Sequence, residues 1–211
     1  MTFRSHRAGL LAALTFIAAA IIAGCGASSD STAPEQRPAA DLRLLTVPST
    51  APALATTIAS FWAVKGKNAG VDLYYRARPG RNDSTKFLEF RLGGASLNRR
   101  PDGSAIADGD SVLITVTVVS PTNLIVEFQP SGLTFSAKDP ARLKMFFGEC
   151  GDDLDRDGVV TSADSSIEQQ LSIWRQETPL APWFKVSSAV VKENKEIDAE
   201  LGGFTGYAVA Y

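Results

Sequence analysis

The chain has 211 residues, of which 45% are hydrophobic, and its 21 basic and 23 acidic residues leave a net charge of −2. This balance excludes a strongly basic nucleic-acid-binding protein. The only histidine, His6, lies in an N-terminal segment that we expect to be removed, so Ser-His-Asp catalysis, Cys-His catalysis and histidine-containing zinc sites are excluded as well.

The first 24 residues have the pattern of an export signal. Arg4 and Arg7 precede an apolar stretch over residues 10–23, and its length of about 14 residues is shorter than the about 20 that span a bilayer. The stretch ends in Ile-Ala-Gly-Cys at residues 22–25. This segment resembles a bacterial lipoprotein signal peptide, which implies that Cys25 is lipidated and becomes the first residue of the mature protein. An ordinary secretory peptide and a membrane-spanning anchor are the alternatives.

Residues 25–41 are predicted to form a flexible tether. They are small, polar and proline-containing, and such a segment cannot bury enough apolar surface to order itself. A flexible chain of this length spans roughly 20 Å, enough to hold a domain clear of the lipid headgroups. We expect a lipid-anchored protein of the cell envelope. The outer membrane is favoured because Gly26, and not an aspartate, follows the lipidated cysteine.

From residue 42 to residue 211 the sequence predicts a single, mainly β domain. Apolar and polar residues alternate with a period of two in several segments, which places one apolar row on one face of each strand. Clusters of turn-forming residues separate these segments. We therefore expect an antiparallel β-sandwich, with a short helix over residues 51–58. The clearest strand segments are residues 88–92, 112–119, 124–129 and 197–201.

One of these segments carries a family resemblance. Residues 126–135 read Val-Glu-Phe-Gln-Pro-Ser-Gly-Leu-Thr-Phe, which resembles the G-P-x-G-L-x-F signature of the β-sandwich domain shared by ankyrins, zonula-occludens proteins and netrin receptors. This domain also occurs on bacterial surface proteins. The resemblance covers about residues 85–211 and implies a sandwich used for interaction or structure, with no catalytic residues.

The C-terminal end of the chain extends this resemblance. Residues 183–186, 197–201 and 204–209 are similar to the closing strands of the bacterial members, in which a His-Phe-Ser-x-Tyr-Ala pattern is common. Here Gly203 replaces the histidine and Thr205 replaces the serine, so this part of the match is incomplete.

Residues 153–164 carry the strongest chemical signal in the chain. They read Asp-Leu-Asp-Arg-Asp-Gly-Val-Val-Thr-Ser-Ala-Asp, which fits the spacing of a twelve-residue calcium loop. Calcium prefers oxygen ligands, and glycine at position 6 allows the sharp turn of such a loop. The predicted ligands are the carboxylates of Asp153, Asp155, Asp157 and Asp164, the carbonyl oxygen of Val159, and the hydroxyl or a bridging water of Thr161.

The loop resembles those of EF-hands and, through its terminal aspartate, those of dockerin modules. It departs from them because residues 143–148 predict a preceding strand instead of a helix, and because no second loop pairs with it. Residues 162–170 are expected to form the exiting helix, with Ser162 as its cap and Asp164 in its first turn. Val160 is expected to point inward. Since an aspartate replaces the usual closing glutamate, we expect a modest dissociation constant of about 10⁻⁴ M.

The remaining chemically notable residues have simpler interpretations. Cys150 is expected to be a buried apolar side chain, because Cys25 is reserved for lipid. The aromatic residues either pack in the core or form a platform on which sugars stack. The candidates for such a platform are Trp62, Trp174, Trp183, Tyr74 and Tyr75.

Taken together, the sequence predicts a lipid-anchored, calcium-binding, non-catalytic envelope protein with a binding or structural role. Its expected partners are the membrane, through the lipid anchor, and a protein or glycan ligand. One alternative is a carbohydrate-binding accessory lipoprotein. Another is an envelope hydrolase that uses a pair of carboxylates, a mechanism that needs no histidine.

Overall fold

The alternating apolar segments form antiparallel strands in two stacked sheets. The computed structural model describes residues 33–80 and 84–211, and the unit from Ala33 to Tyr211 contains both sheets. The predicted signal segment of residues 1–24 and the predicted lipidation site Cys25 lie outside the described residues. Among the residues that are described, no helix has the length and apolar character to cross a membrane.

The larger sheet has seven strands, and every neighbouring pair in it is antiparallel. It contains the two longest apolar alternations of the sequence, so the strands predicted at residues 112–119 and 124–129 are confirmed. In sheet order the strands are β1 (Gln36–Arg37), β11 (Trp183–Lys185), β10 (Ser172–Gln176), β14 (Gly206–Ala210), β7 (Ile125–Gln129), β6 (Ser111–Ser120) and β2 (Ile58–Val64).

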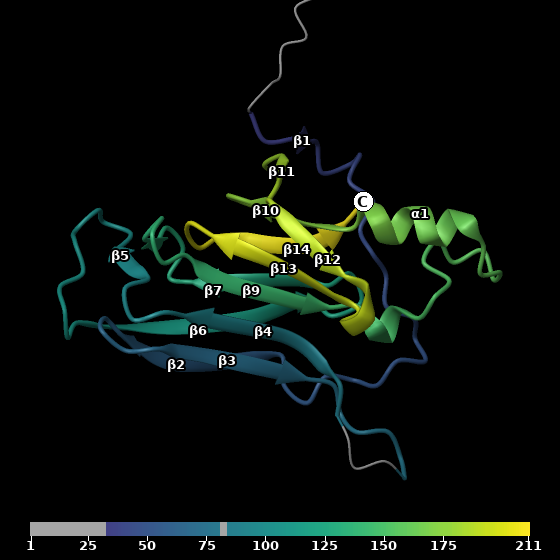
Figure 1. The fold of residues 1–211 in the computed structure, drawn as a ribbon, viewed down its shortest axis with the longest axis horizontal. Coiled ribbons are helices and arrows are strands. Elements are labelled where there is room, and N and C mark those ends of the chain that lie inside the picture. Colours follow the sequence, from purple (N-terminus) through teal and green to yellow (C-terminus); the bar gives the residue numbers. More distant parts are fainter. Residues whose placement is uncertain (1–32, 81–83) are drawn as a thin grey trace, which may run out of the picture. The chain divides into compact units, whose positions relative to one another are not determined.

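The second sheet has five antiparallel strands and packs against the first (Figure 1). It contains the predicted strands at residues 88–92 and 197–201, which are also confirmed. Its strands are β12 (Ser188–Val191), β13 (Glu196–Leu201), β9 (Ala141–Phe146), β4 (Lys86–Leu92) and β3 (Ala69–Tyr74). The short strands β5 (Leu97–Arg99) and β8 (Thr134–Phe135) form a separate pair.

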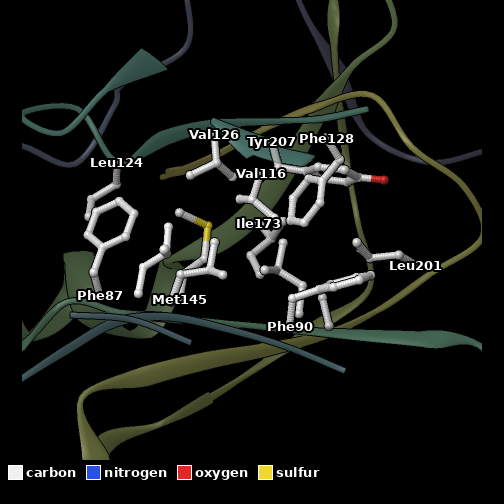
Figure 2. Packing of buried hydrophobic residues seen from close by; sticks show 14 of the residues in the cluster. Phe87, Phe90, Val116, Leu124, Val126, Phe128, Met145, Ile173, Leu201 and Tyr207 are labelled. Carbon is white, nitrogen blue, oxygen red and sulfur yellow. The ribbon is translucent and has the colours of Figure 1, made fainter. Parts of the chain in front are cut away.

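The core lies between the two sheets, as the alternation predicts. On β6 the side chains of Val112, Ile114, Val116 and Val118 are buried, whereas Leu113 and Val119 face solvent. Figure 2 shows side chains of the two sheets pointing toward one another. Phe90 of β4 lies 4.9 Å from Phe128 of β7, measured between ring centroids, and Phe204 stacks on Phe128 at the same distance. These aromatic contacts join segments that are far apart in the sequence.

A second, smaller cluster covers the outer face of the larger sheet. It consists of Leu42, Trp174, Trp183, Ala208 and Ala210. The N-terminal segment lies against this cluster, because Leu45 donates its N–H to Val209 and Tyr211 donates to Arg43.

This arrangement corrects the end of the predicted tether. Residues 36 and 37 form β1, which pairs with β11, so the C-terminal end of segment 25–41 is ordered. The guanidinium of Arg37 lies 5.1 Å from the ring of Trp174 and donates a hydrogen bond to the carbonyl of Tyr211. The composition of this segment does not favour an ordered structure, but these contacts with the folded domain order residues 36 and 37.

The helix predicted over residues 51–58 is not formed. Residues 51–57 are irregular, and Ile58 already belongs to β2. The backbone of this segment bonds to the end of β3 instead, since Ala55 donates to the carbonyl of Tyr74 and Arg76 donates to that of Ala53. Tertiary hydrogen bonds thus replace the local ones that a helix would make.

The only α-helix among the described residues is α1 (Ser162–Gln170). It lies at one end of the sandwich, outside the stacked strands (Figure 1). The chain leaves β9 of the smaller sheet, passes through a 3₁₀ turn (Gly148–Cys150) and the acidic segment 153–164, and then enters β10 of the larger sheet after α1. The acidic segment therefore belongs to a connection between the two sheets.

Candidate metal centre

The acidic loop of residues 153–164 is fixed to the domain by buried side chains near its start. Cys150 and Leu154 both belong to the main core, and Lys195 forms an ion pair with Asp152 at 3.2 Å. Arg156 donates hydrogen bonds to the carbonyl of Asp153, at 2.9 Å, and to the carbonyl of Thr46. The supporting roles of Lys195 and Arg156 were not predicted from the sequence, because only the fold brings Lys195 to Asp152 and Arg156 to the carbonyl of Thr46.

Three carboxylates converge within this loop. Oxygen atoms of Asp153, Asp155 and Asp164 all lie within 4.8 Å of one another. The Oδ1 atom of Asp153 is buried and has no hydrogen-bond partner among the described residues. A buried oxygen without a donor is unfavourable unless a cation or water satisfies it. The group is therefore able to hold a metal ion.

Backbone N–H groups bend the loop around these carboxylates. The N–H of Gly158 donates to Oδ2 of Asp153 at 3.1 Å, and the N–H of Asp157 donates to Oδ1 of Asp155 at 3.1 Å. Gly158 has a φ of +92°, a conformation that residues with a side chain rarely adopt. The glycine at position 6 thus performs the role predicted from the sequence.

Asp164 closes the loop and starts the helix. Its side chain is only 3% exposed, and it accepts N–H groups from Leu154 at 2.6 Å, Asp155 at 3.3 Å and Thr161 at 2.8 Å. Together with Thr161 it forms a capping box on α1. A single carboxylate therefore connects the first residues of the loop with the helix that follows it.

The structure corrects the predicted cap of this helix by one residue. The predicted bounds 162–170 are confirmed, but the N-cap is Thr161 and Ser162 is the first helical residue. The hydroxyl of Thr161 accepts the N–H of Ala163 at 3.1 Å. Both residue types cap helices well, so the local sequence does not distinguish them.

The pKa values of two carboxylates in the loop are shifted in opposite directions. The N–H groups of Thr161, Leu154 and Asp155 outweigh desolvation and lower the pKa of Asp164. At Asp155 the N–H of Asp157 lowers the pKa, but desolvation and the charges of three neighbouring aspartates outweigh it, so the pKa is raised. A bound cation would offset this repulsion.

Two of the predicted ligands, Asp157 and Thr161, have other roles in this structure. Asp157 is not a member of the converging group, and its Oδ1 accepts the N–H of Val159 at 2.8 Å. The hydroxyl of Thr161 caps α1. Val160 was expected to point inward, but it is 64% exposed.

The converging group has the chemistry of a site for a hard cation. Carboxylate oxygens suit magnesium, calcium and manganese, whereas zinc and copper prefer nitrogen or sulfur. The nearby thiol of Cys150 is fully buried in the core. Desolvation raises the pKa of this thiol to about 12; the charge of Arg156 opposes the shift and the charge of Glu149 adds to it. The thiol therefore stays protonated and is a poor metal ligand. The expectation that Cys150 is a buried apolar side chain is confirmed.

The aromatic platform considered from the sequence is not assembled. Trp174, Trp183 and Tyr75 are buried, and only Trp62 is largely exposed. Tyr75 packs edge-on against Phe87 at 5.7 Å. The structure thus places most of these aromatic residues in the two hydrophobic clusters.

A surface hollow of about 760 Å³ lies on the smaller sheet, away from the acidic loop. Four of its charged side chains form pairs: Arg91 contacts Asp72 at 2.7 Å, and Arg142 lies 3.8 Å from Glu200. Such ion pairs are typical of the solvent-exposed face of a sheet, so the hollow is not a candidate site.

No protein-family model, curated protein or solved structure matches this chain.

Proposed function

We propose that this protein is a lipid-anchored, non-catalytic lipoprotein of the bacterial cell envelope whose β-sandwich is stabilised by calcium. The observation that carries the metal proposal is the convergence of Asp153, Asp155 and Asp164 within 4.8 Å, with Oδ1 of Asp153 buried and without a donor among the described residues. The anchor and the location are inferred from the sequence of residues 1–25.

Calcium is favoured over other cations by the ligand set and by the compartment. It takes six to eight oxygens in flexible geometry, and an exported protein meets it at about millimolar concentration. The carboxylate of Asp157, the carbonyl of Val159 and the hydroxyl of Thr161 are close in sequence to the converging group and can complete the shell after small changes of the loop. A dissociation constant of about 10⁻⁴ M suits a site that is occupied outside the cell.

The sandwich is proposed to act as a binding or structural module held near the membrane. The described chain enters it at β1, on one edge of the larger sheet, and the segment from Cys25 to this strand would connect it to the lipid. A lipid-modified cysteine with several acyl chains makes membrane attachment stable. The module's ligand would be a protein or a glycan of the envelope.

Isothermal titration calorimetry tests the metal site directly. The sample is the chain from Cys25 to Tyr211 with Cys25→Ser, so that no lipid is attached. We expect one calcium per chain with a dissociation constant of about 10⁻⁴ M. Asp155→Asn removes one charge of the converging group and is expected to weaken binding at least about tenfold.

A neighbouring aspartate provides the matched control. Asp152 lies beside the loop, outside the converging group, and is paired with Lys195. Asp152→Asn removes the same charge from the same segment and is expected to bind calcium nearly as tightly as the unmodified chain. Absence of binding heat at millimolar calcium, or equal weakening by both substitutions, would contradict the proposed site.

A further inference from the structure

The free edge of β2 differs from the other sheet edges of this domain. Strand β2 has seven residues, Ile-Ala-Ser-Phe-Trp-Ala-Val, with no charge and no proline. At the other edges, β1 has two residues, β12 has four, and β3 carries Asp72 and a register shift at Leu73. Edge strands are usually short, charged or bulged because such features prevent pairing with another strand. Strand β2 has none of these protections.

The register of β2 determines which of its backbone groups face outward. Val118 donates to the carbonyl of Thr57, and Lys65 donates to that of Asp110, at the two ends of the β2–β6 ladder. Hydrogen-bonded pairs alternate along an antiparallel ladder. The odd-numbered residues of β2 therefore bond to β6, and the N–H and C=O groups of its even-numbered residues point away from the sheet.

Three of the four groups at the two ends of this outward row are satisfied within the chain, and the N–H of Val64 has no partner among the described residues. The hydroxyl of Thr56 bonds both the N–H and the carbonyl of Ile58, at 3.3 and 2.7 Å. The carbonyl of Val64 accepts the N–H of Lys67. In the middle of the strand, the N–H and C=O of Ser60 and Trp62 have no such partner within the described residues. Four backbone groups remain available at the centre of the edge.

Apolar side chains surround these groups on the outer face. Trp62 is 64% exposed, Ile58 is 57% exposed, and Leu113, which pairs with Trp62 across the ladder, is 46% exposed. Exposed apolar side chains that adjoin one another mark interaction surfaces more often than isolated ones do. The open edge and the apolar face therefore form one surface.

We propose that β2 pairs antiparallel with β2 of a second copy of this chain, so that the two seven-stranded sheets become one continuous sheet. The two-fold axis lies at Phe61, which places Ser60 of each copy opposite Trp62 of the other. In this register the four free groups of each strand meet those of its partner and form four hydrogen bonds. With the axis at Phe61, each even-numbered residue lies opposite an even-numbered residue of the other copy. The outward-facing N–H and C=O groups therefore meet as the hydrogen-bonded pairs of an antiparallel ladder.

A second copy fits this edge because the surface is compatible with itself. Strand β2 carries no charge, and its outward neighbours on β6 are serine, leucine, threonine and valine, so no like charges face one another across the axis. The small side chain of Ser60 leaves room for the indole of Trp62 from the other copy. The chain enters the domain at β1, the opposite edge of this sheet, and pairing at β2 leaves that end free.

Sedimentation velocity of the chain from Cys25 to Tyr211, with Cys25→Ser, tests the pairing. We expect the sedimentation coefficient to rise from the monomer to the dimer value as the protein is concentrated from low to several hundred micromolar. Ser60→Pro removes one outward N–H from each copy and leaves the bonds to β6 in place. Loss of two of the four hydrogen bonds should weaken the dimer about 5- to 30-fold.

Three further variants separate edge pairing from other kinds of association. Ser60→Ala loses the hydroxyl that contacts Thr115 but keeps the N–H, so it should dimerise like the unmodified chain. Trp62→Lys places like charges beside the axis and should abolish the dimer. Val119→Lys changes an exposed apolar residue of β6 away from the edge and should leave the dimer intact.

Amide hydrogen exchange gives a readout at the residues themselves. The amides of Ser60 and Trp62 should exchange more slowly as the concentration rises, while those of other edge strands stay unchanged. A monomer at every concentration would overturn the proposal, and so would a dimer that Ser60→Pro and Trp62→Lys leave intact. Slowing of these amides only when envelope extract is added would also overturn it, in favour of a strand from another protein. None of these results depends on calcium, so they are independent of the metal site.

Discussion

At the scale of single residues, Gly203 shows how closely segments that are distant in sequence approach one another. A Cβ atom at this position would lie 2.9 Å from the carbonyl oxygen of Leu133. The next residue, Phe204, donates its N–H to that same carbonyl at 2.9 Å. A side chain at position 203 would collide with the backbone of Leu133, so the fold requires a glycine here.

Gly203→Ala is therefore expected to lower the free energy of unfolding. The added methyl group must displace backbone atoms, and such overpacking costs about 1–3 kcal/mol. The measurement is equilibrium unfolding in urea, compared with the unmodified chain.

The adjacent glycine supplies the control. Gly202 has no atom within 4 Å of a built Cβ and no positive φ. Gly202→Ala should be neutral or stabilise the protein by up to about 1 kcal/mol. Equal destabilisation by the two substitutions would show that the close approach at Gly203 is not the cause.

At the scale of elements, α1 depends on its N-terminus more than on packing. The helix has nine residues, and its only fully buried residue is Asp164, a member of the capping box. Isolated helices of this length are marginal in water. The capping hydrogen bonds of Thr161 and Asp164 therefore determine where the helix begins and hold the end of the acidic loop.

Substitutions at the two candidate caps distinguish the observed start of α1 from the predicted one. Thr161→Ala should cost about 1 kcal/mol when calcium is removed with EDTA, because the N–H of Ala163 loses its acceptor. Ser162→Ala should cost nothing measurable, since alanine is the best helix former at an exposed helical position. Thermal unfolding in EDTA measures both, and a larger loss at Ser162 would move the cap to the residue predicted from the sequence.

At the scale of the whole molecule, the acidic loop connects the two sheets. It follows β9 of the smaller sheet and leads through α1 into β10 of the larger one. Its buried residue Leu154 lies in the same core cluster as residues from both sheets. An ion bound in the loop would therefore stabilise the folded domain as a unit, because the loop loses its geometry when the sheets separate.

The expected stabilisation follows from linkage. At about 1 mM calcium and a dissociation constant of about 0.1 mM, binding only to the folded state adds about 1.4 kcal/mol. For a domain of this size the melting temperature should rise by about 3 to 6 °C over a sample in EDTA. Differential scanning calorimetry measures the shift, and Asp155→Asn should remove most of it. Superimposable melting curves with and without calcium would contradict a stabilising site.

Much of the fold could be predicted from the sequence because its signals are local. Alternation of apolar residues predicts the strands β4, β6, β7 and β13, and the spacing of aspartates around Gly158 predicts the acidic loop and its sharp turn. The helix after the loop also agrees with its predicted bounds. Each of these signals depends on the stereochemistry of residues that are neighbours in the sequence, and it is therefore independent of tertiary contacts.

The tertiary structure decided what depends on contacts between distant segments. It excluded Asp157 from the group of converging carboxylates, ordered residues 36 and 37 against β11, and replaced a predicted helix near residue 55 with hydrogen bonds to β3. It also left β2 at an open edge, which no local pattern indicates. The physical reason is that the alternation of apolar and polar residues determines only which side of a strand is apolar. The order of strands in a sheet determines which backbone groups have a hydrogen-bond partner.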